Sequence, residues 1–235
     1  MKYHYVWLLW SSAFLLPWIA LYLTNPFLRT VMWRASLATT VLGLTEPIFV
    51  PEYWNPPSLF ELAQRTGFDI ESLIFSFAIG GVGAVLYNAL TRTHLAPVPA
   101  EQRTEPLHRF HTMALLLPYA AFVPLALLPW NSIYPAIASL VLGGAASVIC
   151  RPRLAKKALT SGALFLGFYT VFMLELKWFA PGYIEQVWNL PALSGVLIYG
   201  IPLEELLFGA AFGLYWSGVY EHYTWTESRA HARVS

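Results

Sequence analysis

Charged side chains are scarce in this chain of 235 residues, of which only 11% are Asp, Glu, Lys or Arg and 57% are hydrophobic. A soluble domain usually carries roughly 25% charged residues. No charged side chain occurs between Lys2 and Arg29, between Glu71 and Arg92, or between Arg109 and Arg151. Uncharged runs of this length are typical of membrane-spanning helices, so the composition excludes a water-soluble globule.

Cysteine is nearly absent, and the basic residues form no patch. The single cysteine, Cys150, cannot form an internal disulfide and has no Cys or His partner at metal-ligand spacing. We therefore exclude redox and structural-zinc roles and expect no metal site. The net charge is only +1, and basic residues stand singly or in short clusters between apolar runs. This pattern excludes nucleic acid as a partner.

Long apolar segments are what the sequence does contain. A spanning helix needs about 20 mostly apolar residues, and seven segments meet this standard: 5–24, 31–50, 70–91, 108–128, 131–150, 158–179 and 202–222. The uncharged run after Arg109 must hold two of them, with a turn at 129–131, because a single helix would be about twice as long as the hydrocarbon is thick. The first segment is too long for a secretory signal and lacks a small-residue cleavage site. We predict an all-α polytopic membrane protein with about seven transmembrane helices.

The basic residues predict the orientation, because Lys and Arg concentrate on the cytoplasmic side. With seven crossings, one side collects 11 of the 14, and the other holds only Lys2, Arg65 and Lys177. The N-terminus is therefore expected outside and the C-terminus in the cytoplasm. An eighth crossing through 190–201 would reverse the C-terminus, but that stretch is too short to span. A short amphipathic helix at 59–65 is expected at the outer interface.

Most of the histidines fall at the expected cytoplasmic ends of helices. We expect these to be solvated surface residues that form no metal-binding spacing: His94, His108, His111, His222 and His231.

The chain contains an internal repeat. Residues 67–87 align with 200–220 at an offset of 133 with seven identities in 21 positions, and a Trp-Asn-x-Pro-x-Leu pattern that begins at Trp54 recurs at Trp188. A displacement by four helices preserves direction, which predicts parallel repeats. The expected organisation is a first three-helix repeat (1–95), a cytoplasmic linker with a connecting helix (96–130), a second three-helix repeat (131–225) and a cytoplasmic tail (226–235).

Five glutamates lie at the expected outer ends of helices: Glu46, Glu71, Glu175, Glu204 and Glu205. A charged side chain costs about 2.5–3.5 kcal/mol at the bilayer centre, so each one needs a reason. Only Lys177 and Arg65 stand near enough to neutralise them. Carboxyl groups that gather in low dielectric without enough cations hold protons near neutral pH, and a neutral carboxylic acid beside an apolar cavity is a general acid.

A structural reading of the same glutamates stays open. Pro202 suits the first position of a helix, where Glu204 and Glu205 would stabilise the macrodipole of the first turn. Two adjacent carboxyl groups exceed what a cap needs, however, and Glu204 recurs as Glu71, so we favour a functional role. Two roles also remain for the tryptophans: they anchor the helices at the membrane interface, or they stabilise a carbocation by cation–π attraction.

Residues 202–208, Pro-Leu-Glu-Glu-Leu-Leu-Phe, follow Trp188 and a Gly-Ile step at 200–201. This segment resembles the Pro-x-Glu-(Glu/Asp)-x-x-Phe signature of the lycopene cyclase domain family. That family occurs as two small three-helix subunits in some bacteria and as a fused chain in archaea and fungi. The doubled three-helix plan looks like the fused form. The first half departs from the signature, since Asp-Ile-Glu-Ser stands at 69–72.

The resemblance implies a membrane carotenoid cyclase, an isomerase that turns the linear ψ ends of lycopene into β-ionone rings without a flavin or nicotinamide cofactor. An acid would protonate the terminal double bond, the neighbouring alkene would close on the cation, and a base would remove a ring proton. We expect Glu204 as the acid, Glu205 as its assistant or the base, and Glu71 as the counterpart in the first repeat. The expected substrate-binding residues are Trp54, Trp188, Asn55, Asn189, Phe208, Phe75, Glu46 and Glu175. The expected partners are a lipophilic carotenoid, the lipid bilayer, and either a second copy of the chain or other enzymes of carotenoid synthesis.

Two other classes remain open. Parallel repeats of three helices with a connecting helix also describe small-solute transporters, although these place polar residues nearer the midplane. The incomplete first motif is also consistent with a carotenoid-binding protein that does not catalyse.

Overall fold

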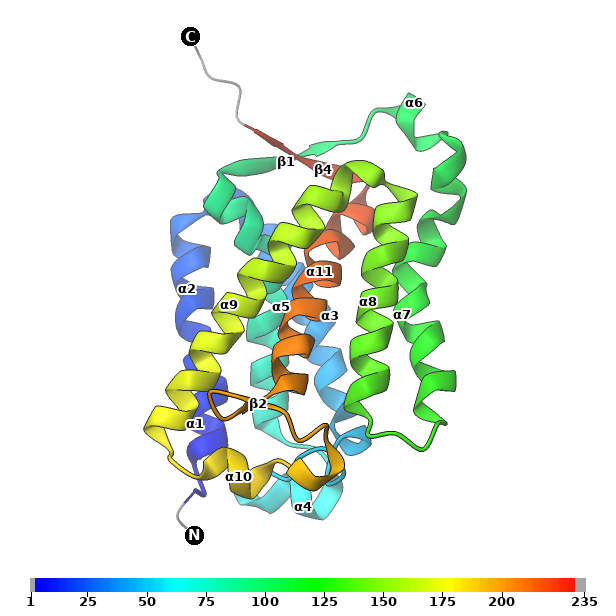
Figure 1. Cartoon of the computed structure of the whole chain (residues 1–235). Coiled ribbons are helices and arrows are strands. Elements are labelled where there is room, and N and C mark those ends of the chain that lie inside the picture. The colour runs from blue at the N-terminus through cyan, green and yellow to red at the C-terminus, as the bar shows by residue number, and fades with distance from the viewer. Residues whose placement is uncertain (1–2, 231–235) are drawn as a thin grey trace.

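The computed structural model describes residues 3–230, and Figure 1 shows them as a bundle of long helices that run in alternating directions. Each of the seven predicted segments is helical. The long helices are α1 (Val6–Ala13) continued by α2 (Leu15–Thr24), α3 (Arg29–Leu42), α5 (Ile70–Thr91), α7 (His111–Ala126), α8 (Ile133–Cys150), α9 (Ala155–Phe179) and α11 (Leu203–Thr224). The turn predicted at 129–131 joins α7 to α8.

Four helical spans in the described part of the chain are long and apolar enough to cross a membrane: Val6–Thr24, Ile70–Thr91, Ile133–Cys150 and Pro152–Phe179. Helix α3 is shorter, because its last turns tighten into the 3₁₀ helix η2 (Gly43–Ile48), which contains Pro47. Large apolar side chains such as Leu16, Val41 and Leu159 are exposed on the outside of the bundle. Since water disfavours so large an apolar surface, lipid is its natural solvent, and the chain is a membrane protein.

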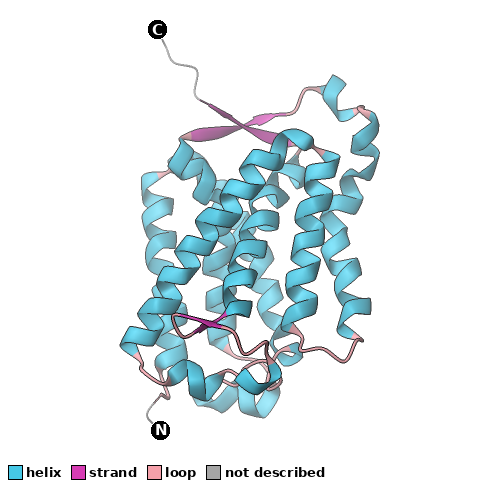
Figure 2. Ribbon diagram, in the orientation of Figure 1, coloured by secondary structure: helices cyan, strands magenta, loops and turns pink. Residues whose placement is uncertain are grey.

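Short elements close the two ends of the bundle (Figures 1 and 2). At the end near α1 lie η3 (Leu59–Glu61), α4 (Leu62–Thr66), α10 (Tyr183–Val187), η6 (Leu190–Ala192) and the strands β2 (Leu197–Ile198) and β3 (Ile201–Pro202). At the opposite end lie η1 (Pro26–Leu28), β1 (Thr93–Pro97), α6 (Ala100–Arg103), η4 (Pro106–Phe110), η5 (Pro152–Leu154) and β4 (Thr226–Ala230). The predicted short helix at 59–65 is therefore present as η3 and α4.

Helices α5 and α11 are the two central elements. Both are 22 residues long, and both bounds of α11 lie 133 residues after those of α5. Each is followed by a residue in the left-handed conformation, Arg92 or Trp225, with φ of 52° and 53°. Each then continues into a strand, and β1 pairs antiparallel with β4, so that Thr93 lies opposite Ala230. The two helices thus share their length, their termination and the strand that follows.

Close packing around α5 depends on Gly80. A Cβ atom at this position would lie 1.5 Å from Oγ1 of Thr39 on α3. On another side of α5, the Nε1 atom of Trp216 donates a hydrogen bond of 3.0 Å to the carbonyl oxygen of Gly80, which joins α11 to α5. The missing side chain therefore allows α3 and α5 to touch.

The expectation that the cytoplasmic-end histidines are solvated is wrong for His108, His111 and His222, which are all buried. The ring of Trp225 stacks on His111 with centroids 3.7 Å apart, and the end of α8 brings Cys150 next to both His108 and His111. The fold thus gives this cysteine two histidine neighbours that lie 42 and 39 residues away in the sequence, which sequence spacing does not indicate. The distribution of basic residues along the sequence locates these histidines near the ends of helices. It does not show that other segments of the chain, such as those with Trp225 and Cys150, cover them there. His94 is half-buried, and His231 lies outside the described residues.

Candidate active site

A cavity of about 420 Å³ lies among the helices of both halves of the chain. Its walls come from α1, α3, η2, α5, α7, α8, α9 and α11, and from the loops that follow η2 and α10. Most lining side chains are aromatic or aliphatic, and none of those described is Lys or Arg. This volume falls in the range of about 300–1,000 Å³ that small-molecule sites usually occupy.

Glu205 is the carboxyl group from the second half of the chain that faces the cavity. Helix α11 begins at Leu203, directly after strand β3, which places Glu205 in the first turn with only 4% of its surface exposed. The carboxyl group accepts hydrogen bonds from the hydroxyls of Tyr53 and Tyr169 (2.6 Å for Tyr169) and from Nε1 of Trp188 (2.7 Å). Burial and the neighbouring Glu205 raise the pKa of Tyr53 well above its usual value, so this phenol keeps its proton and can donate.

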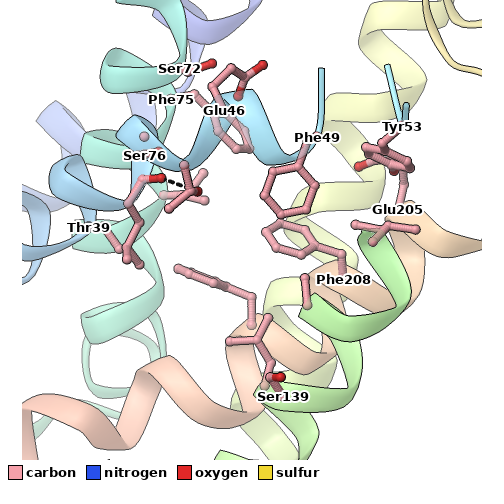
Figure 3. Close-up of a pocket in the computed structure, with 18 of the residues that line it drawn as sticks. Thr39, Glu46, Phe49, Tyr53, Ser72, Phe75, Ser76, Ser139, Glu205 and Phe208 are labelled. Atoms are coloured by element: carbon pink, nitrogen blue, oxygen red, sulfur yellow. Dashed lines mark hydrogen bonds between the residues drawn. The ribbon is translucent and has the colours of Figure 1, made fainter. Parts of the chain in front are cut away.

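Glu46 is the second cavity carboxyl group and comes from η2 in the first half of the chain. It is 7% exposed, and its Oε1 atom has no hydrogen-bond partner among the described residues. Figure 3 shows Glu46 and Ser72 on one side of the cavity and Glu205 with Tyr53 on another, with Phe49 between them. Two carboxyl groups thus approach one apolar space from different walls.

Glu204 and Glu71 are buried but do not line the cavity. Oε1 of Glu204 accepts hydrogen bonds from the Ser194 backbone N–H (2.8 Å) and the Tyr134 hydroxyl (2.7 Å). Oε1 of Glu71 accepts from the Leu59 backbone N–H (2.7 Å). Each glutamate therefore holds the loop that precedes its own helix.

The paired Trp-Asn segments join the two halves at the end of the cavity. Trp54 and Trp188 form an isolated antiparallel bridge, and their rings lie 5.3 Å apart. The Asn55 N–H donates to the Val187 carbonyl, and the Asn189 N–H donates to the Tyr53 carbonyl, at 2.9 Å each. The two asparagines are exposed and the two tryptophans line the cavity, so only the tryptophans can touch a ligand there.

The structure thus gathers part of the predicted site. The predicted residues that line the cavity are Glu46, Trp54, Phe75, Trp188, Glu205 and Phe208. Those that do not are Asn55, Glu71, Glu175, Asn189 and Glu204. Sequence reasoning did not find Tyr53 or Tyr169. The position of Tyr53 directly before the repeated Trp-Asn pair is a signal that could have identified it. Tyr169 lies within α9 and belongs to no motif.

The cavity reaches the outer surface of the bundle beside α7. Tyr119 and Val123 line it, and yet they are 47% and 64% exposed. Tyr119 lies in the middle of α7 and Val123 in its last turn, so both belong to the helix rather than to a loop. A ligand dissolved in the hydrocarbon could therefore reach the cavity sideways.

Residues 131–223 match the family model described as lycopene cyclase. No curated protein and no solved structure matches the chain. The matched region contains Tyr169, Trp188 and Glu205, which form one wall of the cavity, and it spans α8 to the end of α11. The similarity to the lycopene cyclase family therefore lies in the second half of the chain, at residues 131–223.

Proposed function

We propose that the protein is a carotenoid cyclase that converts the linear ψ end groups of lycopene into β-ionone rings. The observation that carries this proposal is Glu205, a buried carboxyl group that three donors hold against an apolar aromatic cavity. The cavity matches the chemistry of a hydrocarbon end group, and its opening beside α7 suits a substrate that arrives from the lipid. One end of the polyene would enter while the remainder extends through that opening.

The reaction needs one proton in and one proton out. An O–H group adds its proton to the terminal double bond, which leaves a tertiary carbocation. The neighbouring double bond then supplies its electron pair to form the ring-closing C–C bond and moves the positive charge onto the ring. A carboxylate finally removes a ring proton, and the C–H electrons form the new double bond. The product is an isomer of the substrate, so no oxidant or reductant is consumed.

The two cavity carboxyl groups differ in a way that assigns these roles. Glu46 is buried without a cation and has an oxygen without a partner, an environment that favours the neutral acid, so Glu46 is the proton donor in this proposal. Glu205 accepts from two phenols and an indole, and such donors stabilise a carboxylate. In this proposal Glu205 is accordingly the group that, once deprotonated, stabilises the cation and removes the ring proton.

Aromatic rings and the exclusion of water protect the carbocation. Trp7, Trp10 and Phe75 line the cavity from α1 and α5, and Phe208 lines it from α11. Ring faces attract a cation, an interaction that strengthens to about 2 kcal/mol or more where water is absent. The same rings keep water from capturing the cation as an alcohol. In this proposal Glu204 and Glu71 position the loops and do not touch the substrate.

We also infer seven crossings, with the N-terminus outside, and two parallel three-helix repeats. The common offset of α5 and α11, and the location of the first and last described residues at opposite ends of the bundle, support this inference (Figure 1). Reporter fusions to the C-terminus test the orientation, because a fluorescent protein fused there should fold in the cytoplasm and alkaline phosphatase should stay inactive.

Expression in a lycopene-producing bacterium tests the proposed activity. The wild-type chain should convert lycopene into products with β rings, which chromatography separates, and Glu205→Gln should abolish conversion. Glu185→Gln, the same change at an exposed residue of α10, is the matched control and should convert normally. Lycopene that stays unchanged with wild-type protein in the membrane would overturn the proposal. Pigment that co-purifies unaltered would instead indicate carotenoid binding, and glutamate-dependent solute flux in vesicles would indicate transport.

A further inference from the structure

A cluster of histidines and the single cysteine lies at the end of the bundle opposite the cavity carboxyl groups. His108 belongs to η4, His111 begins α7, and Cys150 ends α8. All three are buried, and their ligand-capable atoms lie within 4.8 Å of one another. The Sγ atom of Cys150 is 3.5 Å from Nδ1 of His108 and 3.9 Å from Nδ1 of His111. Three segments of the chain therefore direct soft donor atoms to one point.

These distances fit a shared metal ion. Zn²⁺ binds Cys sulfur at about 2.3 Å and His nitrogen at about 2.0–2.1 Å in tetrahedral geometry, so a sulfur and a nitrogen on one ion stand roughly 3.6 Å apart. The two observed separations bracket this value. Two imidazoles and a thiolate are also a donor set that zinc favours over magnesium or calcium.

The surroundings of His111 orient it as a ligand. Its Nε2 atom lies 2.5 Å from the carbonyl oxygen of His222, so Nε2 carries the proton and donates, which leaves the lone pair of Nδ1 directed at the cysteine side. Metal-binding histidines usually donate their second ring nitrogen in this way. Trp225 stacks on the same ring and fixes its plane.

A buried arginine and a third histidine border the cluster. Arg151 follows Cys150 directly and is buried, and it binds the Thr226 carbonyl (3.0 Å) and the Glu227 carboxylate (2.5 Å) in β4. His222 stacks beside His111 with centroids 5.0 Å apart, and its buried Nε2 atom has no hydrogen-bond partner in the described region. A third imidazole, with a buried ring nitrogen that lacks a partner in the described region, therefore lies beside the cluster.

We propose that His108, His111 and Cys150 bind a zinc ion whose fourth position is taken by water. The ion joins η4 and the start of α7 to the end of α8, and the His222 carbonyl extends this connection to the end of α11. It therefore fixes helix α7 against helices α8 and α11. The ion takes no part in the proposed ring closure, since the cavity carboxyl groups lie at the other end of the bundle.

Metal analysis of the full-length protein tests this proposal. The protein is purified in detergent with a tag that contains no histidine, incubated with ZnCl₂ and desalted, and its zinc is measured by mass spectrometry. We expect about one zinc per chain. Cys150→Ser and His111→Gln should weaken binding by more than the roughly 10–100-fold that loss of a second-shell partner causes. His4→Gln, which changes a histidine at the opposite end, is the matched control and should bind as the wild type does.

Cobalt gives a readout in the unaltered chain, in case a variant fails to fold. Co²⁺ added to metal-free wild-type protein should produce a thiolate-to-cobalt charge-transfer band in the near ultraviolet, and ZnCl₂ should abolish that band. Zinc should also raise the thermal midpoint of the wild type but not that of Cys150→Ser. Less than stoichiometric zinc together with no charge-transfer band would overturn the proposal, as would a Cys150→Ser protein that binds zinc as tightly as the wild type.

Discussion

Removing the hydroxyl of Tyr169 tests how strongly the site depends on a negatively charged Glu205. Tyr169→Phe deletes the 2.6 Å hydrogen bond to Oε2 of Glu205 and keeps the buried ring in place. A hydrogen bond to a charged group contributes about 1.5–3 kcal/mol. If the carboxylate develops its full interaction with the carbocation, this loss slows ring closure by roughly 10- to 160-fold.

Tyr134→Phe is the matched control, because it deletes the 2.7 Å hydrogen bond to the adjacent glutamate, Glu204. Since Glu204 does not line the cavity, the rate should stay within about threefold, less than ~0.7 kcal/mol of barrier. The assay is the initial rate of β-ring formation in membranes that contain equal amounts of each variant. A Tyr169→Phe protein as fast as the wild type, or a Tyr134→Phe protein slower than Tyr169→Phe, would refute the assignment and return the reactive role to Glu204.

Three further predictions concern packing, a buried ion pair and substrate entry. Gly80→Ala should lower the free energy of unfolding by about 1–3 kcal/mol, because its Cβ would overlap Thr39, and denaturant titration in detergent measures the loss. Lys157→Met should lower the free energy of unfolding by about 3–5 kcal/mol, because it leaves the carboxylate of Glu221 buried without its partner at 2.9 Å. The double variant Lys157→Met with Glu221→Gln should recover much of this stability. Equal instability of the single and double variants would contradict the prediction. Val123→Trp should narrow the opening beside α7 and slow conversion mainly at low lycopene, whereas slowing only at saturating substrate would argue against lateral entry.

The helices could be predicted because each apolar segment is defined by its own residues. The uncharged run from Ser72 to Thr91 corresponds to α5, and that after Arg109 divides into α7 and α8 at the predicted turn. The strands could not be predicted in the same way. Strands β1 and β4 are short and far apart in the sequence, and their pairing depends on how α5 and α11 place their ends.

The candidate site was only partly predictable, because neighbouring residues on a helix point in directions that differ by about 100°. The motif identifies both Glu204 and Glu205, but only the packing of α11 decides that Glu205 faces the cavity while Glu204 holds the Ser194 loop. Glu46 was expected from its cost in a membrane, and it does line the cavity. The cost of a carboxyl group in a membrane thus identified the glutamates as candidates, and the fold determines which of them line the cavity.

The burial of the histidines could not be predicted from the sequence. His108 in η4 and His111 at the start of α7 are three positions apart, a spacing that places helical side chains on one face. Their burial depends on Trp225 and on Cys150, which come from distant parts of the chain. Composition alone therefore could not distinguish solvated histidines from a buried cluster.

Isotope incorporation during turnover tests the central claim most directly. The purified protein is incubated with lycopene in D₂O, the products are separated by chromatography, and their molecular masses are measured by mass spectrometry. Because the proposed acid exchanges its proton with solvent and delivers it to a ring carbon, each new β ring should carry one deuterium, and Glu205→Gln should give no rings. Unchanged lycopene with folded wild-type protein, or β rings without deuterium, would contradict ring closure by proton transfer in this cavity.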